Sequence, residues 1–172
     1  MSYPELATPA DTADIEKLLD LSFGSDRLQK TTYRLRDGVP PVRELCYVLR
    51  EDGVLRGSIA FWPIEIRRED GGARVPALLL GPLAVDPRLR GQGLGLRLMT
   101  VGLDRARELG HEIVILVGDL PYYGRFGFRR AAPGQFVFPG PVDEDRILMQ
   151  ELVPGALEGV SGYVEKPASA AS

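Results

Sequence analysis

The sequence has very few of the residues from which metal sites and disulfides are built. It contains one cysteine, Cys46, and one histidine, His111. A single cysteine excludes an intrachain disulfide, and these two residues cannot supply the usual ligand sets of a zinc site. We therefore expect a protein with no disulfide and no bound metal.

The chain also lacks the long apolar run and the excess of positive charge that membrane and nucleic-acid binding require. Its longest apolar stretch, residues 75–85, is interrupted by prolines and glycine and is too short to span a bilayer. The first residues contain no basic segment followed by an apolar one, so no secretory signal is visible. The net charge of −3 argues against a general nucleic-acid binder. A cytoplasmic protein with no membrane and no nucleic-acid partner is the simplest interpretation.

What the sequence does contain is the composition of an ordinary globular protein. Of its 172 residues, 44% are hydrophobic and 26% are charged, and this length is enough to bury a core without disulfides. We expect residues 1–165 to form one domain and residues 166–172 to be a disordered tail.

Hydrophobic periodicity predicts a mixture of helices and strands. Helices are expected at about 11–23, 26–36, 93–109 and 120–127, and strands at 45–50, 54–66, 75–85, 112–117, 128–131 and 146–151. Asp-Gly pairs after the first two strands are typical of tight antiparallel turns. The strand, helix and buried strand over 75–117 instead indicate a right-handed parallel crossover. The predicted fold class is therefore α/β, or α+β, with a mixed central sheet.

A glycine-rich turn joins the 75–85 strand to the helix that follows. It reads Arg90-Gly91-Gln92-Gly93-Leu94-Gly95-Leu96. A helix N-terminus leaves backbone N–H groups unpaired and carries partial positive charge, and glycines there let a phosphate approach the backbone. A dinucleotide fingerprint that starts at Gly91 would need glycine at Leu96, and the Gly-Lys-Ser/Thr of a P-loop is absent. The pattern that remains is Arg90-x-x-Gly93-x-Gly95.

A second motif follows the 112–117 strand and reads Gly-Asp-Leu-Pro-Tyr-Tyr-Gly-Arg-Phe-Gly-Phe, residues 118–128. Together the two motifs make the chain resemble the GNAT superfamily of acetyl-CoA-dependent N-acetyltransferases. Residues 118–128 and the ending Leu-Val-Pro-Gly-Ala-Leu-x-Gly-Val-Ser-Gly, residues 152–162, most resemble a bacterial subgroup of predicted N-acetyltransferases. That family binds the pyrophosphate of CoA with Gln/Arg-x-x-Gly-x-Gly/Ala at such a turn, and its later element has a tyrosine before x-x-x-Gly-Phe. The resemblance covers nearly the whole chain.

The resemblance implies a mixed sheet with helices on both faces, whose parallel fourth and fifth strands splay apart to admit the pantetheine arm of CoA. Gly81-Pro82 interrupts the 75–85 strand. Proline cannot donate to a ladder, so the strand must bulge or leave a neighbour there. The resemblance further implies that acetyl-CoA contacts Leu83, Ala84, Val85, Arg90, Gly91, Gln92, Gly93, Leu94, Gly95, Leu96 and Tyr123.

By the same resemblance, the chain moves an acetyl group to a primary amine by direct attack in a ternary complex. A strand N–H near Ala84 or Val85 would polarise the thioester carbonyl. Tyr123 matches the tyrosine that protonates the leaving thiolate, whereas the adjacent Tyr122 is one residue out of register. Members of the family commonly deprotonate the amine with a carboxylate that acts through water.

Two carboxylates are candidates for that base. Glu65 lies on the strand before the second Asp-Gly turn, and Asp119 begins the second motif. Neither belongs to a diagnostic pattern. A salt bridge is the alternative role for Glu65, and capping of the short helix is the alternative role for Asp119.

Other interpretations stay open at this point. A non-catalytic CoA-binding or regulatory module would keep the 90–95 turn without needing Tyr123, so the tyrosine favours an enzyme. Small amines, aminoglycosides, amino acids, protein N-termini and lysines are all compatible acceptors. Regions 20–45, 61–75 and 133–145 flank the core and are expected to select among them. A homodimer is also compatible with the sequence.

Overall fold

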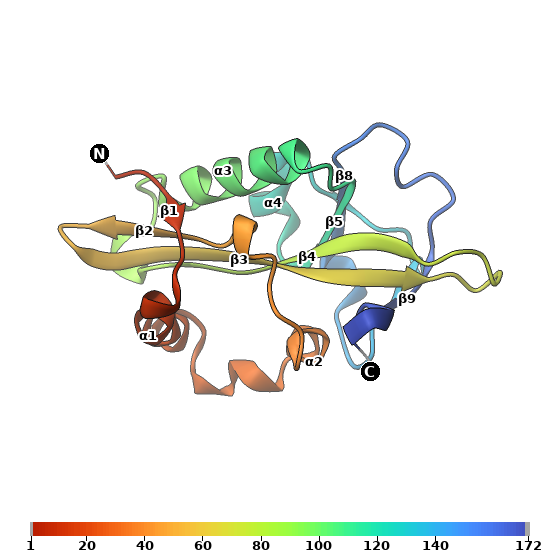
Figure 1. Ribbon diagram of the computed structural model, residues 1–172, viewed down its shortest axis with the longest axis horizontal. Helices are drawn as coiled ribbons and strands as arrows, with labels where there is room; N and C mark the ends of the chain where they lie inside the picture. Colours follow the sequence, from red (N-terminus) through yellow and green to blue (C-terminus); the bar gives the residue numbers. More distant parts are fainter. Residues whose placement is uncertain (1, 171–172) are drawn as a thin grey trace.

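The computed structural model describes residues 2–170, which form a mixed β-sheet with helices on both faces (Figure 1). The main path of the sheet is β1 (Glu5–Leu6), β2 (Tyr47–Glu51), β3 (Val54–Arg67), β4 (Val75–Val85), β5 (Ile113–Val117), β8 (Ile147–Glu151) and β6 (Arg129–Arg130). The strands along this path pair antiparallel except β4 and β5, which are parallel. The predicted fold class is confirmed.

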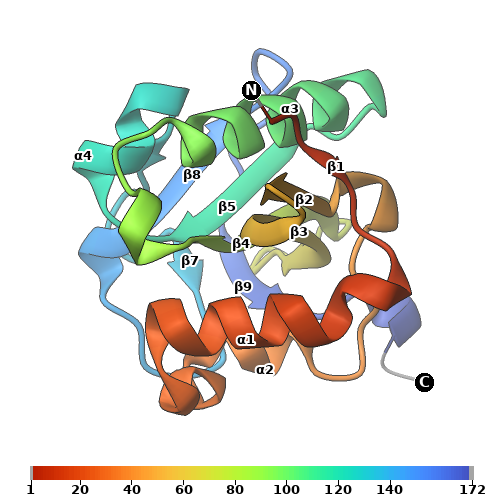
Figure 2. The ribbon, with the colours of Figure 1, turned by 90° about the vertical axis from the view of Figure 1, so that its left-hand side faces the viewer.

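Helices cover the two faces in pairs that are close in sequence. Helices α1 (Thr12–Phe23) and α2 (Thr31–Arg36) lie on one face, and α3 (Leu94–Glu108) and α4 (Leu120–Tyr123) lie on the other (Figure 2). The single helix expected at 26–36 is a 3-10 helix, Ser25–Gln29, followed by α2. The break falls at Lys30, whose ψ of 144° is extended. None of the helices within residues 2–170 is long and apolar enough to cross a membrane.

Helix α3 packs directly on the sheet. Leu98, Met99 and Ala106 are fully buried against core residues of β2–β5. Gly102 makes this approach possible, because a Cβ at that position would lie 2.7 Å from Cε1 of Phe61. Glycine costs a helix interior about 1 kcal/mol relative to alanine, and the close contact with the sheet explains why it stands there.

Some short strands at the edges of the sheet were not predicted from the sequence. Strand β1 has two residues, as does β7 (Phe136–Val137), which pairs with β9 (Gly162–Glu165). Segments this short cannot show a period. In the tail that we expected at 166–172, Ala168–Ala170 form a 3-10 helix, and residues 171 and 172 lie outside the described residues.

The interruption at Gly81-Pro82 separates β4 from β5. The parallel ladder consists of Leu78 opposite Val114 and Leu79 opposite Ile115. On the other edge of β4, the register with β3 shifts opposite Gly81-Pro82, whose peptide bond is cis. Beyond the shift, Leu83–Val85 still pair with β3. The predicted bulge and splay are therefore both present.

Candidate active site

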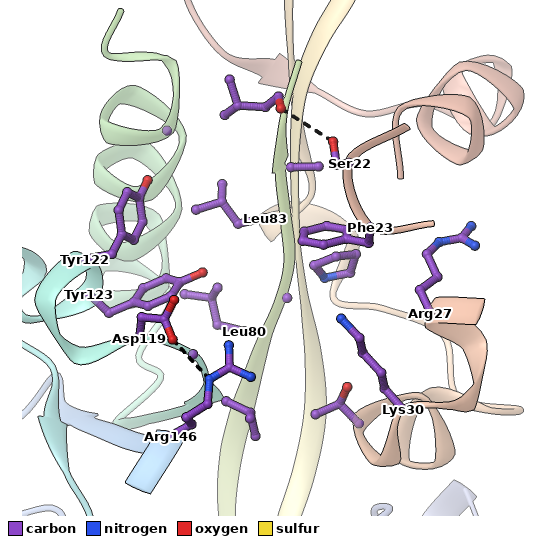
Figure 3. A pocket seen from close by; sticks show the side chains of 18 of the residues that line it. Ser22, Phe23, Arg27, Lys30, Leu80, Leu83, Asp119, Tyr122, Tyr123 and Arg146 are labelled. Atoms are coloured by element: carbon purple, nitrogen blue, oxygen red, sulfur yellow. Dashed lines mark hydrogen bonds and ion pairs between the residues drawn. The ribbon is translucent and has the colours of Figure 1, made fainter. Parts of the chain in front are cut away.

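A cavity of about 930 Å³ lies along the part of β4 that has left β5 (Figure 3). One wall consists of the glycine-rich turn, the start of α3 and residues 117–123. The opposite wall comes from residues 22–36, and residues 141–146 complete the lining. The cavity therefore connects the two faces of the sheet at the splay.

The start of α3 offers unpaired backbone donors to this cavity. The first hydrogen bond of the helix runs from Arg97 N–H to the Gly93 carbonyl at 3.1 Å, so the N–H groups of residues 94–96 have no partner within the helix. Gly91 and Gly93 have φ values of 82° and 84°, and a Cβ on either would meet nothing within 4 Å. The turn is thus an open cradle of the kind that binds phosphate.

A buried carboxylate fixes the chain between β4 and this turn. Asp86 accepts hydrogen bonds from the Arg88 N–H at 3.0 Å, from the Arg88 side chain and from Arg56 Nη1 at 2.7 Å. These bonds, chiefly those from Arg88, hold the pKa of Asp86 well below its ordinary value. The carboxylate is therefore ionised near neutral pH and ties the turn to β3.

Two adjacent tyrosines of α4 point in different directions. The rings of Tyr122 and Tyr123 meet edge-on at 83° with centroids 4.9 Å apart. The Tyr123 hydroxyl points across the cavity toward β4, whereas the Tyr122 hydroxyl points toward α3 (Figure 3). A Cβ on Gly95 would collide with the Tyr122 hydroxyl. Tyr123 is therefore the tyrosine that faces the splay.

The surroundings of Tyr123 favour its protonated form. Burial raises the pKa of the phenol well above its ordinary value of 10.0, and the nearby Tyr122 and Asp119 raise it further. A group that stays protonated at neutral pH can donate a proton but cannot act as a base there. The environment suits a general acid.

The register of β4 shows which backbone donors face the splay. Asp86 donates to the Arg56 carbonyl of β3 at 2.8 Å. Donors alternate along an antiparallel strand, so the N–H of Ala84 points to β3 and those of Leu83 and Val85 point away from it. Of the two N–H groups that we expected to polarise the thioester carbonyl, that of Val85 faces the splay and that of Ala84 does not. The N–H of Leu83 also faces the splay.

This combination of a splayed strand pair, a glycine-rich helix start and a facing tyrosine agrees with the comparisons with known proteins. Residues 4–131 match the family model described as the acetyltransferase (GNAT) domain. The chain belongs to the GNAT acetyltransferase family. It is 38% identical over 159 residues to the uncharacterized N-acetyltransferase YhbS of Escherichia coli, a match that covers 91% of each protein.

Solved GNAT structures share the fold over almost the whole chain. The structure of YhbS from E. coli in complex with CoA matches with a TM-score of 0.79 at 35% identity, covering 96% of this chain and 89% of that one. A GNAT-family acetyltransferase from Brucella melitensis in complex with acetyl-CoA matches with a TM-score of 0.69 at 27% identity, covering 100% and 99%. The family resemblance inferred from the two motifs is confirmed.

Most residues that the GNAT resemblance assigned to the cofactor lie together in the cavity wall. Those that line it are Leu83, Ala84, Val85, Arg90, Gly91, Gly93, Leu94, Gly95, Leu96 and Tyr123. Gln92 does not line the cavity; its carbonyl faces the Arg97 side chain at 3.4 Å. Arg90 is exposed at the rim. No three His, Cys, Asp or Glu side chains within residues 2–170 gather into a group that could hold a metal.

The structure separates the two candidate bases. Glu65 does not line the cavity: its carboxylate accepts a hydrogen bond from the Ala168 N–H at 2.9 Å and lies 3.6 Å from Arg74 Nη1. Asp119 does line it, with Oδ1 3.1 Å from Arg146 Nε, and its side chain does not cap α4. Sequence position alone could not show that Glu65 lies beyond the splay.

We expect Glu65→Gln to leave catalysis almost unchanged, because the carboxylate pairs with Arg74 outside the cavity. The values of kcat and KM should stay within about twofold of the wild type between pH 6 and 9, and stability should fall by less than about 1 kcal/mol. Steady-state kinetics and thermal melting measure both. A tenfold drop in kcat with an unchanged melting temperature would instead support Glu65 as the base that deprotonates the amine.

The cavity wall formed by residues 22–36 and 141–146 could be predicted from the sequence only as broad regions. Residues 22–36 and 141–143 fall within the flanking segments expected at 20–45 and 133–145. Residues 61–75 do not line the cavity, but Trp62 donates its indole N–H to the Gly81 carbonyl at 2.7 Å. Individual residues such as Lys30 and Arg36 carry no motif that would have identified them.

Proposed function

We propose that this protein transfers the acetyl group of acetyl-CoA to a primary amine by direct attack in a ternary complex. The observation that carries this proposal is one cavity that joins the unpaired N–H groups of α3, the splayed edge of β4 and the hydroxyl of Tyr123. The CoA and acetyl-CoA bound in the related structures from E. coli and B. melitensis support it.

The residues present fit a CoA pyrophosphate. The N–H groups of residues 94–96 and the open space beside Gly91 and Gly93 provide donors and room for it. Arg90, which forms no ion pair within residues 2–170, is free to add a charge-assisted hydrogen bond. The pantetheine arm would then run along β4 through the splay.

The chemical step needs a donor for the developing oxyanion and a donor for the leaving group. As the amine nitrogen bonds to the thioester carbon, the N–H of Leu83 or Val85 stabilises the charge on the carbonyl oxygen. The C–S bond then breaks with its electron pair on sulfur, and Tyr123 gives its proton to the thiolate. The attached nitrogen loses its extra proton to water, which leaves the neutral amide, and the Tyr123 phenolate takes a proton back from water. The high pKa of Tyr123 keeps its proton available before the step.

The acceptor must lose a proton before it attacks, because an alkylammonium with a pKa of about 10.4 is mostly charged near neutral pH. Asp119 is the carboxylate beside Tyr123 in the cavity (Figure 3). We assign to it the role of accepting this proton through water. Its contact with Arg146 positions the carboxylate at the cavity wall.

The proposal is tested by incubating the purified protein with acetyl-CoA and a panel of primary amines. Amine-dependent release of free CoA thiol, with the acetylated product found by mass spectrometry, is the expected result. Thiol release without amine provides the background. A folded protein that binds acetyl-CoA but acetylates none of the panel would instead support the non-catalytic module.

A further inference from the structure

Arg36, the last residue of α2, is a buried cation without an anionic partner. It lines the cavity with 9% of its surface exposed, and its Nε and Nη1 atoms are buried with no hydrogen-bond partner. No carboxylate within residues 2–170 forms an ion pair with it. Its guanidinium lies over the rings of Tyr33 and Trp62, 4.3 and 5.7 Å from their centroids.

The second buried arginine of this region, Arg27, has the ion pairs that Arg36 lacks. Arg27 is buried as well, and it pairs with both Glu16 and Asp20. Arg36 keeps its charge at neutral pH even though burial lowers its pKa to about 10. A buried charge is ordinarily paired, so the missing partner points to a ligand that supplies it.

Arg36 lies beside the point where β4 leaves β5. Its Nη2 borders Gly81, where a Cβ would lie 3.2 Å away. Gly81 marks the position at which β4 leaves β5, and α2 lies on the opposite face of the sheet from α3 and α4 (Figure 2). Arg36 therefore faces the splay from the side opposite to the turn that fits the CoA pyrophosphate.

The charge of this wall agrees with an anionic ligand. Lys30 also projects from the α2 side (Figure 3); it lies over the Phe23 ring at 5.1 Å and forms no ion pair within residues 2–170. The acidic residues that line the cavity are Asp119 and Asp143. The first contacts Arg146, and the second accepts from the Asp145 N–H. A polycationic acceptor such as an aminoglycoside would meet like charges here.

We propose that the acceptor is a small amino-carboxylate, with its amine directed at the splay and its carboxylate bound by Arg36. This inference rests on the proposed acetyl transfer and narrows its acceptor class. The guanidinium provides the missing counter-charge in a planar donor group suited to a carboxylate. Lys30 adds long-range attraction for an anion entering the cavity.

The experiment compares amino acids with their carboxamides, which keep the amine and side chain but lose the anion. We expect the wild-type kcat/KM to favour at least one acid over its amide by roughly a hundredfold. In Arg36→Gln, KM for that acid should rise by a similar factor, while kcat, the rate with the amide and the Kd for acetyl-CoA stay within about threefold. Arg36→Lys, which keeps the charge, should restore part of the loss.

Arg34→Gln is the matched control, because Arg34 is exposed on the same helix, donates to the Pro139 carbonyl at 2.9 Å and does not line the cavity. It should leave the acid preference intact. Equal use of acids and amides by the wild type, or equal loss of both in Arg36→Gln, would overturn the inference.

Direct binding separates this inference from the acetyl transfer itself. The CoA-loaded protein is titrated calorimetrically with the same acids and amides. If an amino acid binds only when Arg36 is present but is never acetylated, the anion site is supported and the proposed acetyl transfer is contradicted. No acid binding in the loaded wild type would remove the anion site, even if other amines were acetylated.

Discussion

Tyr123→Phe should lower kcat by roughly ten- to a thousandfold, the range expected when a general acid is lost. The phenylalanine ring keeps the contacts of the tyrosine with Phe128 and Tyr122, so the cavity wall stays in place. The Kd for acetyl-CoA should therefore change by less than about threefold. Steady-state kinetics at saturating acetyl-CoA and amine give kcat, and calorimetry gives the Kd.

Tyr122→Phe is the matched control, because it removes the neighbouring hydroxyl, which points toward α3 (Figure 3). Its kcat should fall by less than about threefold. Burial raises the pKa of Tyr123, so the acid stays protonated on the alkaline side and its deprotonation should cause no fall in rate below about pH 10. An unchanged kcat in Tyr123→Phe would make this residue part of the packing alone.

Gly93→Val should raise the Kd for acetyl-CoA by roughly fiftyfold or more, which corresponds to more than 2 kcal/mol. A Cβ at Gly93 would meet nothing within 4 Å, so the valine side chain enters the open cradle at the start of α3. Isothermal titration of acetyl-CoA into the purified variant measures the change.

Gly110→Val controls for backbone strain, since Gly110 ends the same helix with a φ of 88° and open space around it. Both variants force a β-branched residue into a left-handed conformation, so both should melt earlier by a similar amount. Only Gly93→Val should lose acetyl-CoA. Normal affinity in a folded Gly93→Val protein would show that the turn does not hold the pyrophosphate.

The parts of the site that could be predicted from the sequence are those with local causes. The Arg90–Leu96 turn follows from glycines at a strand-to-helix junction, and the irregularity of β4 follows from a proline that cannot donate to a ladder. The splay of β4 from β5 at that point is what the GNAT resemblance implied. The tyrosine before Gly-Phe is likewise a linear motif. These features can be predicted without knowing which residues pack against them.

The parts that could not be predicted depend on distant contacts. Glu65 sits on a suitable strand, but whether it reaches the cavity depends on how β3 extends past the splay toward Ala168. The choice of Val85 or Leu83 over Ala84 depends on the register with β3. Arg36 could not be predicted as a ligand-binding residue, because its position depends on the folded sheet and on packing against Trp62. Its lack of a carboxylate partner among the described residues is likewise visible only in the structure.

The assignment of the cavity to CoA is tested most directly by a calorimetric titration of the ligand-free protein with acetyl-CoA, with NAD as the control. We expect one acetyl-CoA to bind per chain with a micromolar Kd and NAD not to bind, because the turn carries Leu96 where a dinucleotide fingerprint needs glycine. A folded protein that binds no acetyl-CoA, or that binds NAD equally well, would contradict the assignment of this cavity to CoA.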